Sequence, residues 1–386
     1  MNICFFNLAE AESENVANGV VRVATVLAGA LRKRGHSVVF YPPPNPSSVQ
    51  EGGTCRSWAT NGKLFRKFLI ERNIDAAVWQ MGNCRIPFSL KNLPCRLIAV
   101  WHNAPDYKMS TYAELLAEKY NVRIPIIRSL ICSSVGRCVV QWVYECYRAL
   151  AFFYTTACSD KFVLLSEKFF PNFLPAKFFP KKVCAIPNPA SFGVEGAVLG
   201  AKQKELLFVG RLENGQKRVD LLLKIWEKLE GYFPDWCLRI VGDGPSAEML
   251  RRLALKCGLK RVFFEGRRDP SPFYRDAAIF CMTSAFEGWG MTLVEASAFG
   301  CVPVAFDSYA SVSDIISHGN NGILVPAFDC EKYATELSAL MCDSDLRNRM
   351  GVAALDRIRD FAPEKIADRW ETLFSEMKAS GLSVPV

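Results

Sequence analysis

The stretch AAIFCMTSAFEGWGMTLVEASAFGCVPVAF, residues 277–306, contains one strand–helix–strand pattern. Residues 278–282 and 302–305 are short apolar runs of the kind that form buried parallel strands. A helix is expected to begin between them near Met291, directly after a loop with two glycines. Because parallel strands joined by a helix lie in one sheet covered by helices, this stretch predicts an α/β fold.

The same alternation of apolar runs and helical spacing extends in both directions along the chain. Further strands of the second half are expected at residues 205–209, 238–241, 261–264 and 322–325. Strands of the first half are expected at residues 3–6, 37–40, 76–79, 96–101, 162–165 and 183–186. Each half therefore predicts a parallel sheet with helices on both faces.

The length of 386 residues also favours two domains, because a single core rarely extends beyond about 250–300 residues. We predict two Rossmann-like, doubly wound domains that face each other across a cleft. The predicted boundaries are 1–188 for the first domain, 189–203 for a linker rich in proline, glycine and alanine, and 204–362 for the second domain. A final helix within 363–386 is expected to pack back on the first domain.

The composition argues against several classes of protein. No apolar run reaches about 18 residues, so a transmembrane helix is not expected. The first ten residues resemble a buried strand more than a signal peptide. The 15 cysteines are scattered without a C-x-x-C pair, which disfavours a disulfide framework or a zinc site. We therefore expect a cytoplasmic protein with reduced, mostly buried cysteines.

The net charge of +8 comes from a basic first half. An anionic partner such as the inner face of a membrane or a phosphorylated acceptor would suit it, and ordinary surface variation is an equal alternative. Residues 168–182 mix aromatics with lysines, and residues 139–154 are apolar. Both segments are compatible with peripheral membrane contact or with a buried core face. No nucleic-acid partner is expected.

Ligands of open parallel sheets bind at the carboxyl ends of the strands, so the loops after the strands are candidate sites. Gly210 and Arg211 directly follow a predicted strand, and Lys217 comes shortly after. Two cations at a strand end suit a diphosphate, because arginine binds its oxygens in a bidentate manner and lysine acts as a point charge. Two surface cations beside a helix are the alternative. The turn at 242–245 is as compatible with a plain connection as with ligand contact.

The loop within the opening stretch carries the strongest indication of a site. Gly288 and Gly290 allow close approach of a ligand to the backbone, and the free N–H groups of residues 290–292 would form an anion site. Glu287 lies just before the helix and Glu295 one turn inside it. Two such carboxylates can accept hydrogen bonds from sugar and ribose hydroxyls. Two acids that only stabilise the helix start are the alternative.

The same residues form a pattern found in a known family. Glu-x7-Glu within FEGWGMTLVEASAFGCVPV (286–304) resembles the signature of the retaining glycosyltransferases of GT-B fold, family 4, also called glycosyl transferases group 1. The supporting segments follow in the family's order: LLFVGRLENGQKRVDLLL, LRIVGDGP, VFFEGRRD and NNGILVP. The resemblance is strong over residues 183–380 and weaker in NGVVRVATVLAGALRKRGHSVV, WHNAPDY and IPNP of the first half.

The resemblance implies transfer of a sugar from a nucleoside diphosphate to an acceptor hydroxyl, with retention at the anomeric carbon. Arg211 and Lys217 would neutralise the donor diphosphate. Glu287 would contact the donor sugar, and His102, at a strand end of the first domain, would reach the transferred sugar. No metal and no cofactor are required, and a UDP-sugar is favoured over a GDP-sugar. The expected acceptor is a saccharide or a lipid-linked molecule.

Donor-binding positions implied by the family are Gly19, Gly210, Arg211, Lys217, Arg267, Glu287, Gly290, Met291, Thr292 and Glu295. Glu295 would hold the ribose hydroxyls, and Arg267 would meet the nucleotide base. The sequence departs from the family at Asn18, which replaces a glycine, and at Val21, where many members have glutamate. Both departures affect the loop that contains Gly19.

Other functions are left open by the sequence. A GT-B-type sugar-nucleotide epimerase would share the fold with different motifs, and a non-catalytic nucleotide-sugar-binding protein would keep the site. A dinucleotide oxidoreductase is disfavoured, because no G-x-G-x-x-G follows the first strand. The Asp-x-Asp at 343–345 lies in a polar helix-start segment and is interpreted as a helix cap, not as a metal site.

Overall fold

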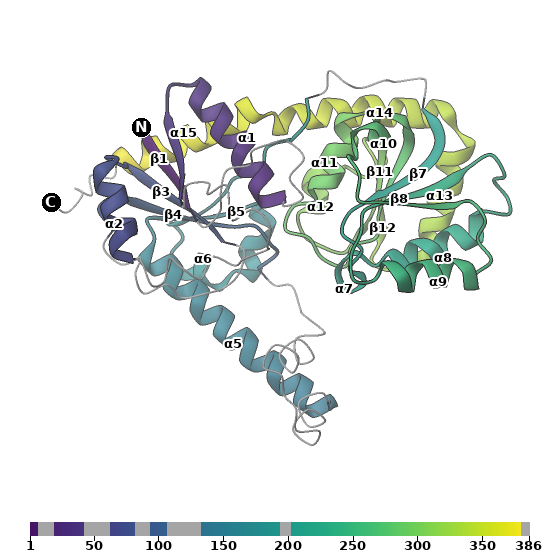
Figure 1. Cartoon of the computed structure of the whole chain (residues 1–386), viewed down its shortest axis with the longest axis horizontal. Helices are drawn as coiled ribbons and strands as arrows, with labels where there is room; N and C mark the ends of the chain where they lie inside the picture. The colour runs from purple at the N-terminus through teal and green to yellow at the C-terminus, as the bar shows by residue number, and fades with distance from the viewer. Residues whose placement is uncertain (7–18, 42–61, 82–92, 106–132, 194–201, 380–386) are drawn as a thin grey trace. The chain divides into compact units, whose positions relative to one another are not determined.

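The computed structural model describes residues 1–6, 19–41, 62–81, 93–105, 133–193 and 202–379. The chain divides into two compact units. The first unit comprises Met1–Glu10, Leu31–Ala185 and Phe374–Val386, and the second comprises Ala11–Ala30 and Ile186–Leu373. Each unit contains its own six-stranded sheet (Figure 1), so the predicted α/β fold with two Rossmann-like sheets is confirmed.

The sheet of the first unit is parallel in all its described pairs and has the order β2-β1-β3-β4-β5-β6. Its strands are β1 (Asn2–Phe6), β2 (Ser37–Tyr41), β3 (Ala76–Met81), β4 (Arg96–Trp101), β5 (Lys161–Leu164) and β6 (Val183–Ala185). Ile3, Val78 and Ile98 have no exposed surface, as expected for strands covered on both faces. Chain order reverses at β1, which is the mark of a doubly wound sheet.

The described helices that contribute to the first unit are α1 (Gly19–Lys33), α2 (Gly62–Glu71), α5 (Ser134–Cys158), α6 (Leu174–Phe178) and α15 (Pro363–Ala379). Aromatic packing fixes the last turns of α5 on the sheet. The buried ring of Phe152 lies 4.8 Å from Trp101 of β4 and 6.0 Å from Phe162 of β5, in edge-to-face geometry. The 25-residue α5 is therefore anchored through its C-terminal part.

The sheet of the second unit is also parallel and has the order β12-β11-β10-β7-β8-β9. Its strands are β7 (Gln203–Val209), β8 (Cys237–Val241), β9 (Val262–Gly266), β10 (Ala277–Met282), β11 (Val302–Asp307) and β12 (Ile323–Pro326). All six residues of β10 are buried, which agrees with the unbroken apolar run seen in the sequence. The stretch that opened the sequence analysis thus forms the centre of this sheet.

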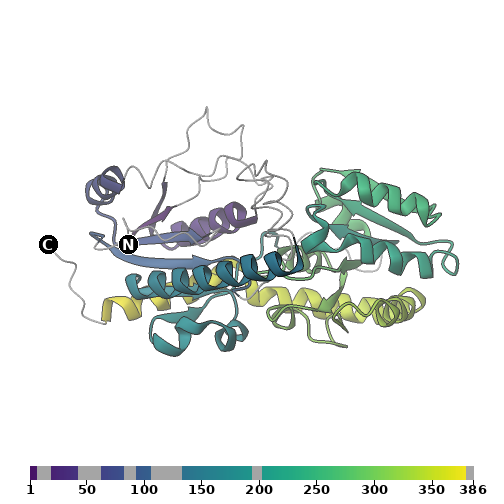
Figure 2. The same ribbon diagram turned by 90° about the horizontal axis from the view of Figure 1, so that it is seen from below.

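Helices lie on both faces of the second sheet (Figures 1 and 2). They are α7 (Asn214–Lys217), α8 (Val219–Leu229), α9 (Ala247–Lys256), α10 (Ser271–Asp276), α11 (Met291–Ala298), α12 (Val312–Ile315), α13 (Cys330–Cys342) and α14 (Ser344–Ile358). In α8, Leu222, Ile225 and Trp226 are fully buried at helical spacing and belong to the main core. These three residues define the face of α8 that packs on the sheet.

Asp343 caps α14, because its carboxylate accepts the N–H of Leu346 at 2.8 Å. The interpretation of the Asp-x-Asp segment as a helix cap is confirmed. None of the helices described here combines the length and the apolarity that a membrane span requires.

The division of the chain differs from the predicted boundaries in two respects. Residues 11–30, predicted in the first domain, belong to the second unit, and α15 is shared between the units at Phe374. The ring of Phe374 lies 6.1 Å from that of His36, and Glu376 pairs with Lys161 at 3.2 Å. Of the predicted linker, residues 194–201 lie outside the described residues, as does Asn18.

Candidate functional site

The loops at the carboxyl edge of the second sheet are neighbours, because β10, β7, β8 and β9 are adjacent and parallel. β7 is followed by Gly210 and Arg211, and β9 by Arg267. β10 leads into the loop that ends at Gly290. Residues far apart in the sequence therefore meet along one edge of this sheet.

Lys217 and Glu287 form an ion pair at this edge, with the Nζ and Oε1 atoms 2.5 Å apart. Their side chains are only 15% and 11% exposed. Gln216 donates from its amide nitrogen to the other carboxylate oxygen of Glu287 and to the carbonyl of Phe286, each at 3.2 Å. Two consecutive residues of α7 thus hold both oxygens of one carboxylate.

Main-chain hydrogen bonds dock α7 on the loop after β10. The N–H of Ala285 donates to the carbonyl of Gln216 at 2.7 Å, and the hydroxyl of Thr283 donates to the carbonyl of Lys217 at 3.0 Å. Glu213 caps the first N–H groups of α7 with its carboxylate. Because these contacts involve the backbone, they fix the main-chain position of Lys217. They place no constraint on its long side chain.

Glu295 lies one turn inside α11 and is 4% exposed. Its Oε1 atom accepts from Nη1 of Arg22 at 2.8 Å, and its Oε2 atom accepts the hydroxyl of Tyr274 at 3.0 Å. Arg22 comes from the part of α1 that belongs to the second unit. Burial raises the pKa of Glu295, and the charges of Arg22 and Lys217 together with the Tyr274 hydrogen bond oppose that rise.

Gly290 precedes α11 in the left-handed region, with φ of +94°, where glycine is favoured. A Cβ atom at this position would lie 2.9 Å from the hydroxyl of Tyr309. No side chain caps the helix here. The N–H groups of Met291 and Thr292 are in the first turn and have no intrahelical acceptor, so they suit an anion.

The loop of Gly210 is supported by the loop after β8. The N–H of Leu212 donates to the carbonyl of Asp243 at 2.9 Å. A Cβ atom at Gly242 would lie 1.9 Å from the carbonyl oxygen of Gly210, and one at Gly244 would lie 2.6 Å from that of Leu212. The turn whose role the sequence left open therefore supports the loop of the candidate site by direct backbone packing.

Arg211 is 65% exposed, and its guanidinium lies 3.9 Å from the carboxylate of Glu213. A Cβ atom at Gly210 would lie 3.7 Å from Cε of Lys217, so the loop that carries Arg211 is next to Lys217. The exposed guanidinium is free to move toward a ligand, whereas Lys217 is already engaged.

Arg267 is exposed and follows Gly266, whose φ is +68°. Gly19 is the first residue of α1 and is exposed, and a Cβ atom there would meet nothing within 4 Å. The structure thus brings Lys217, Glu287 and Glu295 together around the start of α11. Arg267 lies on a loop of the same edge, and among the described residues it forms no ion pair or hydrogen bond with that cluster.

His102 belongs to the first unit, where it follows β4. Its Nε2 atom lies 2.5 Å from the amide oxygen of Gln80, in β3. Because that oxygen only accepts, Nε2 carries the proton and Nδ1 is left as an acceptor. Nδ1 is buried with no partner among the described residues. Burial lowers the pKa of His102 to about 4, so the ring is neutral at pH 7.

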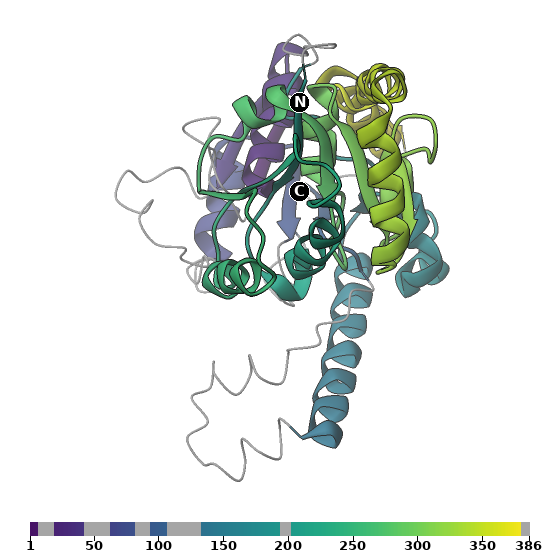
Figure 3. The same ribbon diagram turned by 90° about the vertical axis from the view of Figure 1, so that its right-hand side faces the viewer.

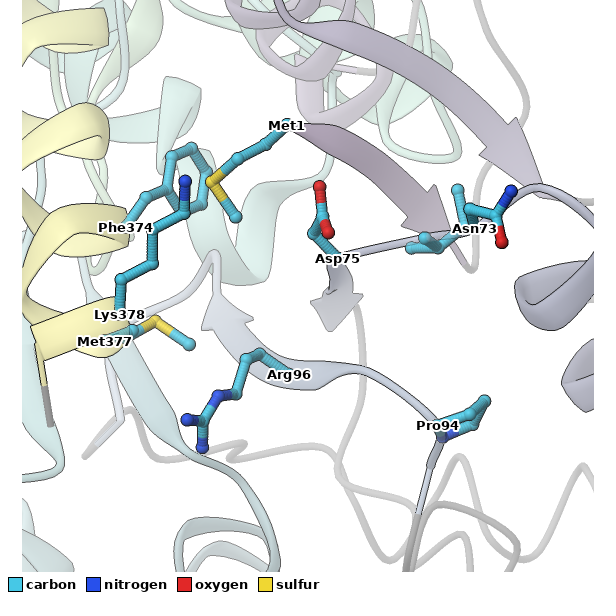
Figure 4. A pocket seen from close by; sticks show the side chains of 9 residues that line it. Met1, Asn73, Asp75, Pro94, Arg96, Phe374, Met377 and Lys378 are labelled. Carbon is cyan, nitrogen blue, oxygen red and sulfur yellow. The ribbon is translucent and has the colours of Figure 1, made fainter. Parts of the chain in front are cut away.

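A cavity of about 450 Å³ lies at the opposite edge of the first sheet (Figure 4). It is lined by the amino ends of β1, β3 and β4 and by Phe374, Met377 and Lys378 of α15. Two of its charged groups are engaged within the unit: Asp75 accepts the N–H of Asn2 at 2.7 Å, and Arg96 pairs with Asp160 at 3.0 Å. The cavity contains none of the predicted site residues. Among the described residues, no cluster could hold a metal ion.

Sequence reasoning missed four residues that contact the predicted ones. The positions of Gln216 and Arg22 in the sequence could have indicated a role. Gln216 directly precedes Lys217, and Arg22 lies one helical turn after Gly19. Gln80 is a polar residue near the end of an apolar strand. Tyr274 carried no signal, because its contact with Glu295 depends on how α10 packs beside α11.

Solved structures define the class of this fold. HepE of Anabaena in complex with UDP-glucose has a TM-score of 0.68 at 15% identity, over 97% of this chain and all of that one. The lipopolysaccharide outer core galactosyltransferase WaaB gives 0.65 at 17% identity, with the same coverage. Both likenesses concern the fold, and they identify it as the GT-B fold of glycosyltransferases.

The sequence comparisons identify the family. The profile of the glycosyl transferases group 1 matches residues 196–357. An uncharacterised glycosyltransferase of Haemophilus influenzae is 30% identical over 92% of this chain and 96% of its own length. The amylovoran biosynthesis glycosyltransferase AmsD of Erwinia amylovora is 29% identical over 69% of this chain and 75% of its own length. The chain belongs to the glycosyl transferases group 1, and it is a glycosyltransferase.

Proposed function

We propose that this glycosyltransferase transfers a sugar from a nucleoside-diphosphate donor to a hydroxyl of a saccharide or lipid-linked acceptor, with retention of anomeric configuration. The observation that carries the proposal is the cluster of Lys217, Glu287 and Glu295 around the uncapped start of α11. One cation, two carboxylates and free N–H groups match a diphosphate joined to two polyhydroxylated groups.

The charges favour a diphosphate over a neutral sugar. Lys217 is held by Glu287, and Arg211 is exposed on the adjacent loop. A phosphate oxygen about 4 Å from either cation would gain on the order of 4 kcal/mol at an effective dielectric near 20, before desolvation. A donor that takes over Lys217 would release Glu287 to accept sugar hydroxyls, so one ligand satisfies both partners.

The proposed chemistry balances without a metal or a cofactor. The bond from the anomeric carbon to the diphosphate oxygen breaks, and a bond to the acceptor oxygen forms on the same face. The acceptor proton passes to an oxygen of the leaving diphosphate. Arg211, Lys217 and the start of α11 stabilise the charge that grows on that group, which is electrostatic catalysis.

Support for the donor class comes from similar proteins. Solved structures of HepE contain UDP, UDP with glucose, or UDP-glucose, and that of the pneumococcal O-GlcNAc transferase GtfA contains UDP and GlcNAc. We propose a UDP-sugar over a GDP-sugar on this basis. AmsD is named for amylovoran biosynthesis, which supports a polysaccharide acceptor. The basic first half supports contact with a membrane that holds a lipid-linked acceptor.

Ligand-dependent stabilisation tests the donor class. The melting temperature of the protein is measured with UDP-, GDP- and ADP-sugars, since a ligand of the native state raises it by mass action. We expect a rise with UDP-sugars that is lost in Lys217→Ala and kept in Lys224→Ala, an exposed lysine of α8. Equal stabilisation of both variants would contradict the proposed site.

Product analysis tests the reaction. With donor and acceptor together, the anomeric configuration of the product is determined by NMR, and retention is expected. Epimerised sugar nucleotide from donor alone would indicate the epimerase instead. Tight donor binding without turnover of any acceptor in a saccharide and lipid-linked panel would indicate a binding protein.

A further inference from the structure

One face of α5 is apolar and exposed over five turns. Val135, Val139, Trp142, Val143, Leu150 and Phe153 are between 37% and 74% exposed. Their spacing of three, four or seven residues places them on one side of the helix. Cys146, also exposed, falls on the same side. We call these seven residues the α5 stripe.

The charged residues of α5 lie away from the stripe. Arg148 is buried at 8% exposure, and its guanidinium lies 5.7 Å from the ring centre of Tyr144. Glu145 accepts from Gln141 at 2.8 Å. The helix therefore packs on its own unit through Phe152 and presents a second apolar face outward, where an ordinary surface helix is polar. Figure 3 shows the first turns of α5 extending beyond the sheet of the first unit.

The stripe continues onto α6. The ring of Phe153 lies 5.5 Å from that of Phe178 and 5.0 Å from that of Phe179. Phe178 is 62% exposed and Leu174 is 48% exposed. The apolar surface thus spans two helices, which is larger than the scattered exposed side chains of most monomers.

Basic residues border the α6 end of this surface. Lys177 and Lys181 are exposed and flank Phe178 in the sequence, and residues 168–182 contain no aspartate or glutamate. Lys182 connects the end of α5 to the end of α6. Its ammonium group donates to the carbonyl of Ala157 at 2.7 Å and lies 5.9 Å from the ring of Phe179. Apolar side chains next to lysines match the interface of an anionic bilayer.

We propose that the α5 stripe with Leu174 and Phe178 docks the protein on an anionic membrane surface, with Lys177 and Lys181 contacting lipid headgroups. A second copy of the chain fits this surface less well, because an isologous interface would offer Lys177 and Lys181 only the same apolar and basic side chains and no carboxylate. A bilayer accepts a long apolar helix face without matching shape, and Trp142 is of the residue type that favours its interface.

Vesicle flotation tests the docking surface without donor or acceptor, so its failure would leave the proposed reaction untouched. Vesicles of neutral phosphatidylcholine are compared with vesicles that contain about one third phosphatidylglycerol. We expect the wild type to float with the anionic vesicles, with weaker binding at high salt. The triple variant Val139→Glu, Trp142→Glu, Leu150→Glu should lose binding about tenfold or more. All three side chains are exposed, so folding should be kept.

Matched controls place the same charges elsewhere. Tyr232→Glu with Leu255→Glu changes two residues that are 83% and 78% exposed in the second unit and should leave flotation unchanged. Lys177→Glu with Lys181→Glu should weaken binding to anionic vesicles only, whereas Lys256→Glu with Lys260→Glu, exposed lysines of the second unit, should not. Circular dichroism and melting temperature verify that each variant is folded.

Two outcomes would overturn the proposal. One is equal flotation of the wild type and the α5 triple variant. The other is a wild type that does not bind vesicles and elutes as a dimer, with the triple variant eluting as a monomer, which would assign the stripe to a second copy. Quenching of Trp142 by brominated lipid, lost in Trp142→Phe, would support insertion of the stripe directly.

Discussion

The carboxyl edges of the two sheets are organised differently. In the second unit, charged groups are paired with one another: Lys217 with Glu287, and Arg22 with Glu295. In the first unit, His102 is a neutral group held by one hydrogen bond from a ring nitrogen to Gln80. The difference is consistent with the proposal that the second edge exchanges its ion pairs for a charged ligand. The first edge offers a neutral acceptor nitrogen on His102.

Loss of Lys217 should have the largest effect. In Lys217→Ala, the leaving diphosphate loses a cation and Glu287 loses its partner, so kcat/KM should fall by about 10²–10³. Steady-state kinetics with the preferred donor measures it, and Lys224→Ala is the matched control. A loss below about threefold would show that the paired edge does not hold the diphosphate.

Removal of Arg22 should make donor binding depend on pH. The charge of Arg22 lowers the pKa of Glu295 against its burial, so Arg22→Ala should raise that pKa further. Glu295 would then gain a proton at a higher pH than in the wild type, so the donor KM should rise about tenfold at a pH at which the wild type still binds the donor normally. The wild type and Arg252→Ala, an exposed arginine of α9, should show no such rise. If the donor KM of Arg22→Ala does not change with pH, Arg22 does not influence the predicted ribose site through Glu295.

Gly290 and Gly19, both predicted donor-binding positions, differ in backbone conformation and in the space around them. Gly290→Ala forces a Cβ into a left-handed position 2.9 Å from Tyr309 and should cost about 1–3 kcal/mol of unfolding free energy. Gly19→Ala meets nothing within 4 Å and should leave stability unchanged. Denaturant unfolding measures both. If Gly19→Ala also keeps full activity, the loop of Gly19 does not approach the phosphates.

The titration of His102 should have the smallest effect, a change in the pH dependence of stability. Its pKa of about 4 lies below the ordinary 6.5, so the unfolded chain binds the extra proton first as the pH falls. This histidine therefore contributes a loss of stability between about pH 6.5 and 4, and none above. Gln80→Glu should favour the charged ring and raise its pKa, which NMR titration of the ring would detect. If the pKa of His102 is the same in Gln80→Glu, Gln80 does not position the ring through this hydrogen bond.

The fold followed from the sequence because each strand of the second sheet is a short apolar run bounded by glycine or a polar turn. The meeting of Lys217 with Glu287 was implied by the family resemblance and is seen in the structure, while their roles with a donor stay predictions. Tyr274 was missed because its contact with Glu295 depends on tertiary packing, which no local pattern encodes, whereas the position of Arg22 one helical turn after Gly19 could have indicated its role.

The apolar face of α5 illustrates the same limit. The apolar composition of residues 139–154 was compatible with membrane contact and with a buried core face, and the sequence alone could not distinguish the two. Only the packing of Phe152 on Trp101 shows which side is inward. The aromatic and basic residues at 168–182 were likewise open to two interpretations until the rings of Phe153 and Phe178 were found together.

The contact between the loops after β7 and β8 has a consequence for engineering. Carbonyl oxygens of Gly210 and Leu212 occupy the space that side chains at Gly242 and Gly244 would need. The two loops therefore behave as one interlocked part. When the loop after β7 is replaced by that of a relative with another donor preference, the loop after β8 should be replaced with it. Either loop alone would lack the partner against which its backbone packs.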